Sequence, residues 1–428
     1  MRIKHNHREH ENSKSGLWVI AGCFCMIFVC LGFCSSNKSI YLTAITEALD
    51  IKRSLFSIND SFRFVSTAVV NLFFGMLIQK FGVKKLVGAG FLSLIISTLI
   101  YAYATDVGLF YLGGCFLGIG LAWTTTTMST YLVNRWFKEN RGTMSGLVLC
   151  ANGLGGAVAA QIVTPIIYAE GNVFGYRNAY KLVALLLLIA GIIVVTLIRE
   201  PTSLPANTDK KKSRGRHWPG ILLSEALRKP YFYAAGVCVF LTGMCLQGIN
   251  GIAAAHLKGT GISASVVANV LSIHSVALCC SKLFVGFSYD KLGLRTTLII
   301  CEVFGICSFL SLAFSGATSL GIGCAVVWAV TSSLALPLET VMVPLITADL
   351  FGEKDFSKLM GIFVSLNTAG YAFGTPVANI VFDITGTYTP ILYLNAIFML
   401  AIMVSFCFII NAAYKVRKHT LLSVEDNA

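Results

Sequence analysis

Charged residues are scarce in this sequence of 428 residues. They account for 12% of the chain, whereas a soluble protein carries about 25%. Hydrophobic residues make up 56%, and the mean hydropathy is +0.75. The composition excludes an ordinary soluble globular domain and is typical of an integral membrane protein.

The sequence also lacks the residue groupings on which enzymes and metal proteins depend. It has no His, Asp and Glu grouping with metal-ligand spacing, no glycine-rich phosphate loop and no ATP-binding domain. Most of its 14 cysteines lie inside apolar runs, without the paired spacing in loops that predicts disulfides. We therefore expect no catalytic residues, no metal and no cofactor. A sensor is disfavoured because no soluble output domain is evident.

The net charge of +13 raises the question of a nucleic-acid partner. Of the 33 Lys and Arg residues, 25 lie in the segments that fall on one side of the membrane when successive apolar runs alternate in direction. This asymmetry follows the positive-inside rule and predicts that both termini are cytoplasmic. Attraction to anionic lipids explains the charge, so we expect a lipid bilayer and no nucleic acid as partner.

Twelve apolar runs are long enough to cross a membrane, since a span needs about 20 residues. A basic, proline-containing segment divides them into two groups of six. We expect a cytoplasmic tail over 1–16, a six-helix bundle over 17–198, a basic linker over 199–229, a second bundle over 230–414 and a cytoplasmic tail over 415–428. The predicted helices cover residues 17–38, 57–79, 86–105, 108–132, 143–167, 178–198, 231–254, 265–288, 296–314, 319–348, 358–382 and 389–413.

An eleven-residue motif occurs at matching places in the two halves. Each copy has a Gly where two helices can approach, a polar or acidic residue followed by Lys, a Gly suited to a turn, and then cations. Internal repeats of this kind are typical of transporters that rock two bundles about a central site. The motif residues are Gly75, Gln79, Lys80, Gly82, Lys84 and Lys85 in the first copy, and Gly286, Asp290, Lys291, Gly293 and Arg295 in the second.

Cations inside the predicted spans are candidate binding residues, because each costs about 2.5–3.5 kcal/mol even on a lenient insertion scale. Lys282 and Arg63 are the two that we expect to face an anionic substrate. Lys38 stands at the outer end of the first span, where it would guide the substrate in. Snorkelling of Lys282, a salt bridge between Arg63 and Asp60 and an interface anchor at Lys38 are the alternatives.

Glu339 and His274 are the candidates for proton coupling. Glu339 lies between Pro337 and Pro344, where we expect a bent helix. His274 shares a helix face with Lys282 and belongs to the residue type that titrates near neutral pH. A structural partnership of Glu339 with Lys282, and a core role for His274, remain open.

Two amides complete the candidate site. Asn250 lies on the seventh predicted span, and Asn367 lies on the eleventh. Asn367 follows Gly361 by the same interval at which Asn152 follows Gly146, which extends the repeat between the halves. Our tally of embedded charges is three cations against one or two acids, and that sign favours an anionic substrate.

The repeated motif resembles the loop motif of the major facilitator superfamily, and the resemblance covers essentially the whole chain. It implies an all-α integral membrane fold with twelve transmembrane helices in two pseudo-symmetric six-helix bundles. Several positions further resemble the monocarboxylate transporter family and its bacterial relatives, which include oxalate–formate exchangers. They are Lys38-Ser39-Ile40, Trp136-Phe137-Lys138, Lys282 and Glu339; departures are Leu278, where the animal carriers have an acid, and Asn367, where the exchangers have a lysine.

The resemblance implies a multi-pass transporter in the plasma membrane, acting as a monomer. Its substrate would be a small monocarboxylate or short dicarboxylate, moved by alternating access with a proton or in exchange for another anion. The two motif loops would brace the inner face of the carrier. The alternative is a carrier of a neutral metabolite or drug-like compound on the same fold.

Overall fold

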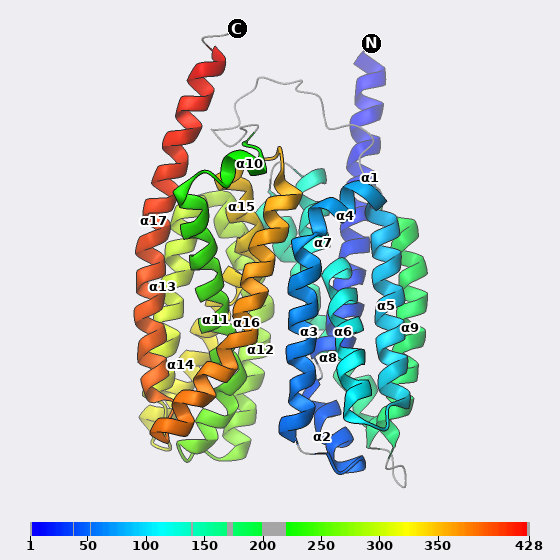
Figure 1. The fold of residues 1–428 in the computed structure, drawn as a ribbon, viewed down its shortest axis with the longest axis vertical. Helices are drawn as coiled ribbons and strands as arrows, with labels where there is room; N and C mark the ends of the chain where they lie inside the picture. Colours follow the sequence, from blue (N-terminus) through cyan, green and yellow to red (C-terminus); the bar gives the residue numbers. More distant parts are fainter. Residues whose placement is uncertain are drawn as a thin grey trace. The chain divides into compact units, whose positions relative to one another are not determined.

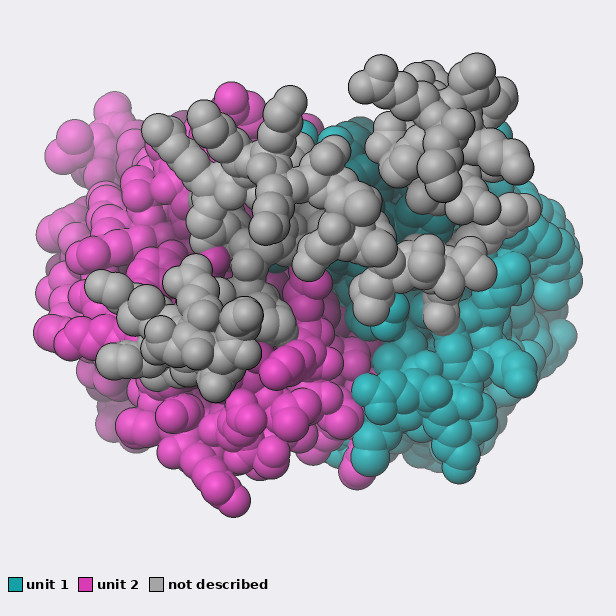
Figure 2. Space-filling view, turned by 90° about the horizontal axis from the view of Figure 1, so that it is seen from above, with its two compact units in different colours: residues 1–71, 76–208 teal, residues 72–75, 209–428 magenta. Residues whose placement is uncertain are grey.

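The computed structural model describes residues 2–36, 38–51, 53–137, 140–168, 174–198 and 220–425. Its regular elements over these residues are all helices. Most of the predicted linker, residues 199–219, and the side chain of Lys38 lie outside the described part. The chain divides into two compact units, shown in different colours in Figure 2. We call residues 1–71 and 76–208 the N unit, and residues 72–75 and 209–428 the C unit.

Long helices build both units (Figure 1). The first part of the chain contains α1 (Arg2–Leu31), η1 (Gly32–Ser36), α2 (Lys38–Ala48), α3 (Arg53–Leu72), α4 (Phe74–Phe81), α5 (Val83–Tyr103), α6 (Val107–Thr124), α7 (Thr126–Trp136), α8 (Arg141–Ile167) and α9 (Gly175–Leu197). The second part contains α10 (Leu223–Ala226), α11 (Pro230–Gly259), α12 (Ala264–Leu292), α13 (Leu294–Ala313), α14 (Ser319–Ala335), η2 (Leu338–Met342), α15 (Val343–Phe351), α16 (Phe356–Thr385) and α17 (Thr389–Glu425).

The helices agree with the predicted membrane spans. Among the described residues, ten helical segments are long and apolar enough to cross a membrane, or eleven if the bent pair Ile58–Leu72 and Phe74–Phe81 is one span. The remaining predicted span falls on α16, which is 30 residues long but carries polar side chains such as Asn367. Each of the twelve predicted spans therefore contains a helix. The helices also extend further than predicted at both ends, since α1 begins at Arg2 and α17 ends at Glu425.

Glycines allow neighbouring helices within each unit to approach closely. A Cβ atom at Gly155 on α8 would overlap the backbone oxygen of Phe28 on α1. In the C unit, a Cβ at Gly374 on α16 would overlap the backbone oxygen of Met244 on α11. Small residues at such contacts are the usual means of packing helices in lipid, where apolar surface alone gives no preference for protein over lipid.

Two π-helical turns interrupt the long spans, and both lie at polar positions. η1 ends the first span and contains Ser35, whereas η2 contains Glu339. The bend expected between Pro337 and Pro344 is thus a π-helical turn. Each backbone hydrogen bond in such a turn spans one residue more than in an α-helix. π-turns are frequently found at functional sites.

The end of the predicted linker is fixed to the loop between α15 and α16. The backbone N–H of Ile221 donates to the Phe351 carbonyl at 2.9 Å, and that of Leu223 donates to Asp355 Oδ2 at 2.9 Å. Lys358 Nζ lies 3.1 Å from Asp355 Oδ1. Burial raises the pKa of Asp355, but the Leu223 N–H and the Lys358 ammonium outweigh it and hold the pKa below its ordinary value. The segment from 220 to 226 is therefore anchored to the C unit.

Replacing Gly155 with Ala tests the close contact of α1 and α8. We expect Gly155→Ala to lower the free energy of unfolding by about 1–3 kcal/mol, because the added methyl group forces the helices apart. Gly323→Ala on α14 is the matched control, since a Cβ there meets no atom within 4 Å. Thermal unfolding of the two purified variants should separate them; equal melting temperatures would contradict the contact.

Candidate functional site

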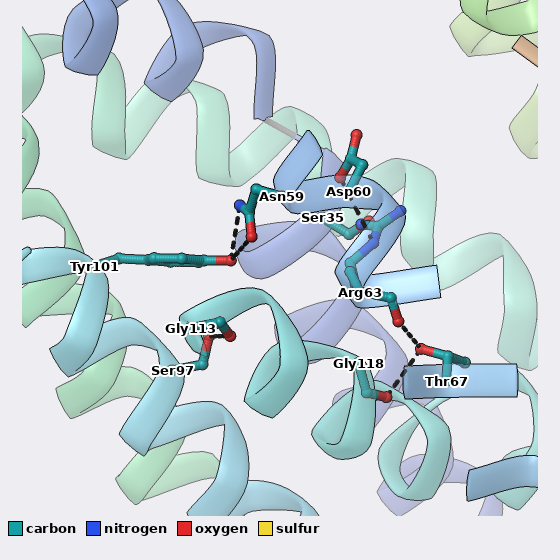
Figure 3. A network of polar contacts seen from close by, with 9 residues as sticks. All are labelled: Ser35, Asn59, Asp60, Arg63, Thr67, Ser97, Tyr101, Gly113 and Gly118. Atoms are coloured by element: carbon teal, nitrogen blue, oxygen red, sulfur yellow. Dashed lines mark hydrogen bonds and ion pairs between the residues drawn. The ribbon is translucent and has the colours of Figure 1, made fainter. Parts of the chain in front are cut away.

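Polar side chains of the N unit gather around Arg63 on α3 (Figure 3). Arg63 Nη1 donates to Ser35 Oγ at 2.8 Å, which links α3 to η1. Its Nε lies 3.8 Å from Asp60 Oδ1, one helical turn away. Asn59 donates to Tyr101 Oη at 2.9 Å and accepts from it at 3.0 Å. We call Ser35, Asn59, Asp60, Arg63 and Tyr101 the arginine cluster.

The guanidinium of Arg63 has donors without a partner among the residues that the structure describes. Its contacts within the described chain are the bond to Ser35, the long ion pair with Asp60 and the Phe64 ring, whose centroid is 4.3 Å from Cζ. The side chain is only 11% exposed. A guanidinium has more N–H donors than these contacts use, and its flat fork suits a carboxylate bound through two oxygens. The predicted salt bridge with Asp60 therefore exists without saturating Arg63.

A second group of polar side chains surrounds Glu339 in the C unit. Asn367 Nδ2 donates to the Glu339 carbonyl oxygen at 3.0 Å and to Tyr371 Oη at 2.7 Å. The Tyr371 side chain and the Gln247 backbone hydrogen-bond the Glu339 carboxyl. Glu339 is 7% exposed and Asn367 is 3% exposed, yet Glu339 Oε1 and Asn367 Oδ1 have no partner among the described residues. We call Gln247, Glu339, Asn367 and Tyr371 the glutamate cluster.

The other predicted site residues of the C unit occupy different surroundings. Lys282 on α12 is buried, with 5% of its surface exposed, and it makes a contact of its own. His274 is stacked on Trp328 of α14, with ring centroids 5.2 Å apart, and its Nε2 has no partner within the described chain. Asn250 is exposed on α11. The structure thus brings Glu339 and Asn367 together, and it shows no bond from Asn250 to them.

The two copies of the loop motif have the same local structure. In the first copy, Gly82 separates α4 from α5 and has φ 75°; in the second, Gly293 separates α12 from α13 and has φ 86°. Both glycines occupy the left-handed region, where a residue with a Cβ is strained. Gln79 and Lys80 end α4, as Asp290 and Lys291 end α12. The cations Lys84, Lys85 and Arg295 then lie in the first turns of α5 and α13.

The structure corrects the tally of embedded charges. Glu302 on α13 is fully buried and was not counted, although it is the acid of the predicted span 296–314. Asp349 on α15 is also buried, and its Oδ1 accepts from Tyr289 Oη at 2.9 Å. Together with Glu339, these acids make three, against two embedded cations with a described side chain: Lys282, which is buried, and Arg63, whose side chain is 11% exposed. The tally therefore does not favour an anionic substrate, and only the Arg63 donors that lack a partner among the described residues do so.

Several cluster members were not predicted as site residues. Asn59, Tyr101 and Tyr371 are uncharged residues within long spans, and no sequence pattern distinguishes them from neighbours that face lipid. Ser35 belongs to a short polar run before Lys38, which is the one signal that was available.

Two clusters of polar residues within long apolar helices, together with the repeated loop, are features of a transporter. The sequence model of the Major Facilitator Superfamily matches residues 23–344 and 235–423. The chain belongs to this superfamily. It is therefore a multi-pass membrane transporter that works by alternating access, and its family and relatives point to transport rather than to an enzyme.

Relatives within the superfamily include carriers of acids. The chain is 25% identical to the sialic acid transporter NanX of Escherichia coli over 55% of this chain and 56% of that protein. It is 24% identical to the oxalate:formate antiporter of Oxalobacter formigenes, over 75% and 73% of the two chains. It is 22% identical to human monocarboxylate transporter 2, over 87% and 80%. These similarities confirm the resemblance to the monocarboxylate transporter and oxalate–formate exchanger group.

Solved structures confirm the major facilitator fold. The E. coli fucose:proton symporter FucP aligns with a TM-score of 0.69 at 15% identity, over 92% of this chain and 99% of that one.

The Asn59–Tyr101 pair can be tested by removing one hydroxyl. Tyr101→Phe leaves the Asn59 amide, which is 5% exposed, without its partner. We expect a loss of about 1–3 kcal/mol in the free energy of unfolding. Tyr103→Phe on the same helix is the control, because Tyr103 is 64% exposed. A Tyr101→Phe protein that melts at the wild-type temperature would show that the pair contributes nothing.

Proposed function

We propose that the chain transports a small organic anion, either a monocarboxylate or a short dicarboxylate, across the plasma membrane. The observation that carries this proposal is the Arg63 guanidinium, on a side chain only 11% exposed, whose contacts with Ser35 and Asp60 leave donors without a partner among the described residues. A buried cation with open donors is costly in the membrane unless it meets an anion during the transport cycle. A carboxylate bound to the fork of Arg63 satisfies that requirement.

In this proposal, the glutamate cluster of the C unit handles the proton. Glu339 is held by Tyr371 and the Gln247 backbone, but its Oε1 has no partner in the described part of the chain, so it has room for a proton or for a substrate donor. Asn367 adds a free carbonyl oxygen beside it. Lys282 supplies a second cation, Lys38 guides the anion from outside, and Asn250 and His274 are secondary candidates. The carrier works as a monomer by proton symport or by anion exchange.

The relatives support an acid as the substrate. The oxalate:formate antiporter, monocarboxylate transporter 2 and the sialic acid transporter are all named for acids. The alternative is a carrier of a neutral metabolite or drug-like compound, in which Asp60 and Glu339 serve only to compensate the embedded cations.

Uptake into liposomes that contain the purified protein distinguishes these functions. Labelled formate, oxalate, lactate and pyruvate are offered with and without an inward proton gradient, and with each anion preloaded inside. Uptake driven by the gradient establishes proton symport, whereas acceleration only by an internal anion establishes exchange. If folded protein moves none of these carboxylates, the neutral-substrate carrier replaces our proposal.

Two substitutions test the proposed binding cations. Arg63→Lys keeps the charge but removes the fork, so we expect KM for the transported carboxylate to rise about 10- to 100-fold. Lys282→Gln should abolish transport while membrane insertion stays intact. Arg177→Lys on α9 and Lys258→Gln at the end of α11 are matched controls outside both clusters. Wild-type kinetics in Arg63→Lys would remove the fork from the binding site, and full activity in Lys282→Gln would remove that residue.

The motif loops are proposed to brace the inner face when the carrier opens outwards. Lys84→Ala should therefore lower the turnover number more than it raises KM, since the loop acts on the conformational change and not on the substrate. Lys415→Ala, an exposed cation on α17, is the control. A large rise in KM at unchanged turnover would count against a bracing role.

A further inference from the structure

Glu302 is a buried carboxyl that belongs to neither the arginine cluster nor the glutamate cluster. It lies on α13, two helical turns from the start of the helix, and none of its surface is exposed. Neither carboxyl oxygen has a hydrogen-bond partner within the described chain. Glu339, the other buried glutamate of the C unit, has such partners. Glu302 is therefore unlike an acid that is kept in place by a structural hydrogen-bond network.

Among the described residues, Glu302 forms no ion pair. A narrow cleft between α13 and α17, too tight to hold a water molecule, is lined by apolar side chains and by Arg295, Glu302 and Cys407. Arg295, about two turns away at the helix start, is in this lining but forms no ion pair with Glu302. From α11, the thiols of Cys238 and Cys245 lie within electrostatic range. Together with Cys301, the preceding residue, these groups are the titratable or charged neighbours of Glu302 among the described contacts.

Cys245 on α11 lies near both Glu302 and the glutamate cluster. Its thiol lies within electrostatic range of both Glu302 and Glu339. The two glutamates thus lie near one residue of α11, with Glu302 on the side of α13 and α17 and Glu339 on η2. The lining of the cleft extends from Arg295 at the start of α13 to Glu302, a distance of about 10 Å along the helix.

We propose that Glu302 is a second proton-binding site of this carrier, next to the glutamate cluster and reached from the end of the bundle where Arg295 lies. A carboxyl without partners is stable in an apolar interior only when it is neutral, and an ionised form would need water or a cation. Its proton exchanges when the helices around the cleft separate. Loading and release of the proton are thereby tied to a change of conformation, which is what coupling to transport requires. This inference rests on the proposed function in one respect, namely the substrate whose transport the proton accompanies.

Infrared difference spectra after a pH change test proton binding without any substrate. Wild-type protein in liposomes, Glu302→Gln and Glu339→Gln are compared. We expect Glu302→Gln to lose a protonated-carboxyl band that Glu339→Gln retains, and to take up about one proton fewer per chain. Should Glu302→Gln fail to fold, Glu302→Asp must keep a shifted band. A spectrum of folded Glu302→Gln identical to that of the wild type overturns the proposal.

Proton flux during transport separates a coupling site from a carboxyl that is merely neutral and buried. Glu302→Gln preserves shape without titrating, so we expect substrate-dependent proton movement to fall while substrate counterflow persists. Unchanged proton movement in this variant would show that Glu302 never exchanges its proton, and the proposal would then be wrong. If the protein moves no carboxylate at all, the infrared result still stands, so failure of the proposed function is distinguishable from failure of this inference.

Discussion

The structure depends on one constraint: polar groups inside the hydrocarbon must find their partners within the protein. The constraint explains why the helices are apolar along most of their length, and why their polar side chains occur in groups. Ser35 accepts a hydrogen bond from Arg63, and Asn59 pairs with Tyr101, so these bonds link η1, α3 and α5. No lipid atom can replace them. The same constraint makes unpaired polar groups informative about function. Within the described residues, donors of Arg63 and an oxygen of Glu339 lack partners at positions where an unpaired polar group is costly.

These exceptions divide the labour of a carrier between the two units. In the proposed function, the N unit supplies a cation whose geometry suits a planar anion, and the C unit supplies carboxyl groups that gain or lose protons. Small residues at the helix contacts keep this arrangement close-packed, while the π-helical turns place Ser35 and Glu339 within it. The membership of the Major Facilitator Superfamily fixes the fold and the type of transport; the substrate is decided by side chains that vary within that fold.

The helices and the repeated loop were predictable, because apolar length and the paired motif are properties of the sequence alone. Arg63 and Glu339 could also be chosen as candidates, since a charge within an apolar run is visible without a structure. Tyr101 and Tyr371 were not, because the face that a helix presents to its neighbours depends on its rotation. Glu302 was missed for a different reason: it was absorbed into a long hydrophobic run, although its charge was as visible as that of Glu339.

The π-helical turn η2 has a consequence for how this protein tolerates insertions and deletions. A π-turn accommodates one residue more than the α-helix it interrupts, so deleting a residue there would restore regular α-helical geometry. Every residue of α15 would then rotate by about 100° around the helix axis. Asp349 would turn away from Tyr289, its partner on α12. Deleting one residue of η2 would therefore change which residues of α15 are buried. The number of residues in this turn is for that reason constrained.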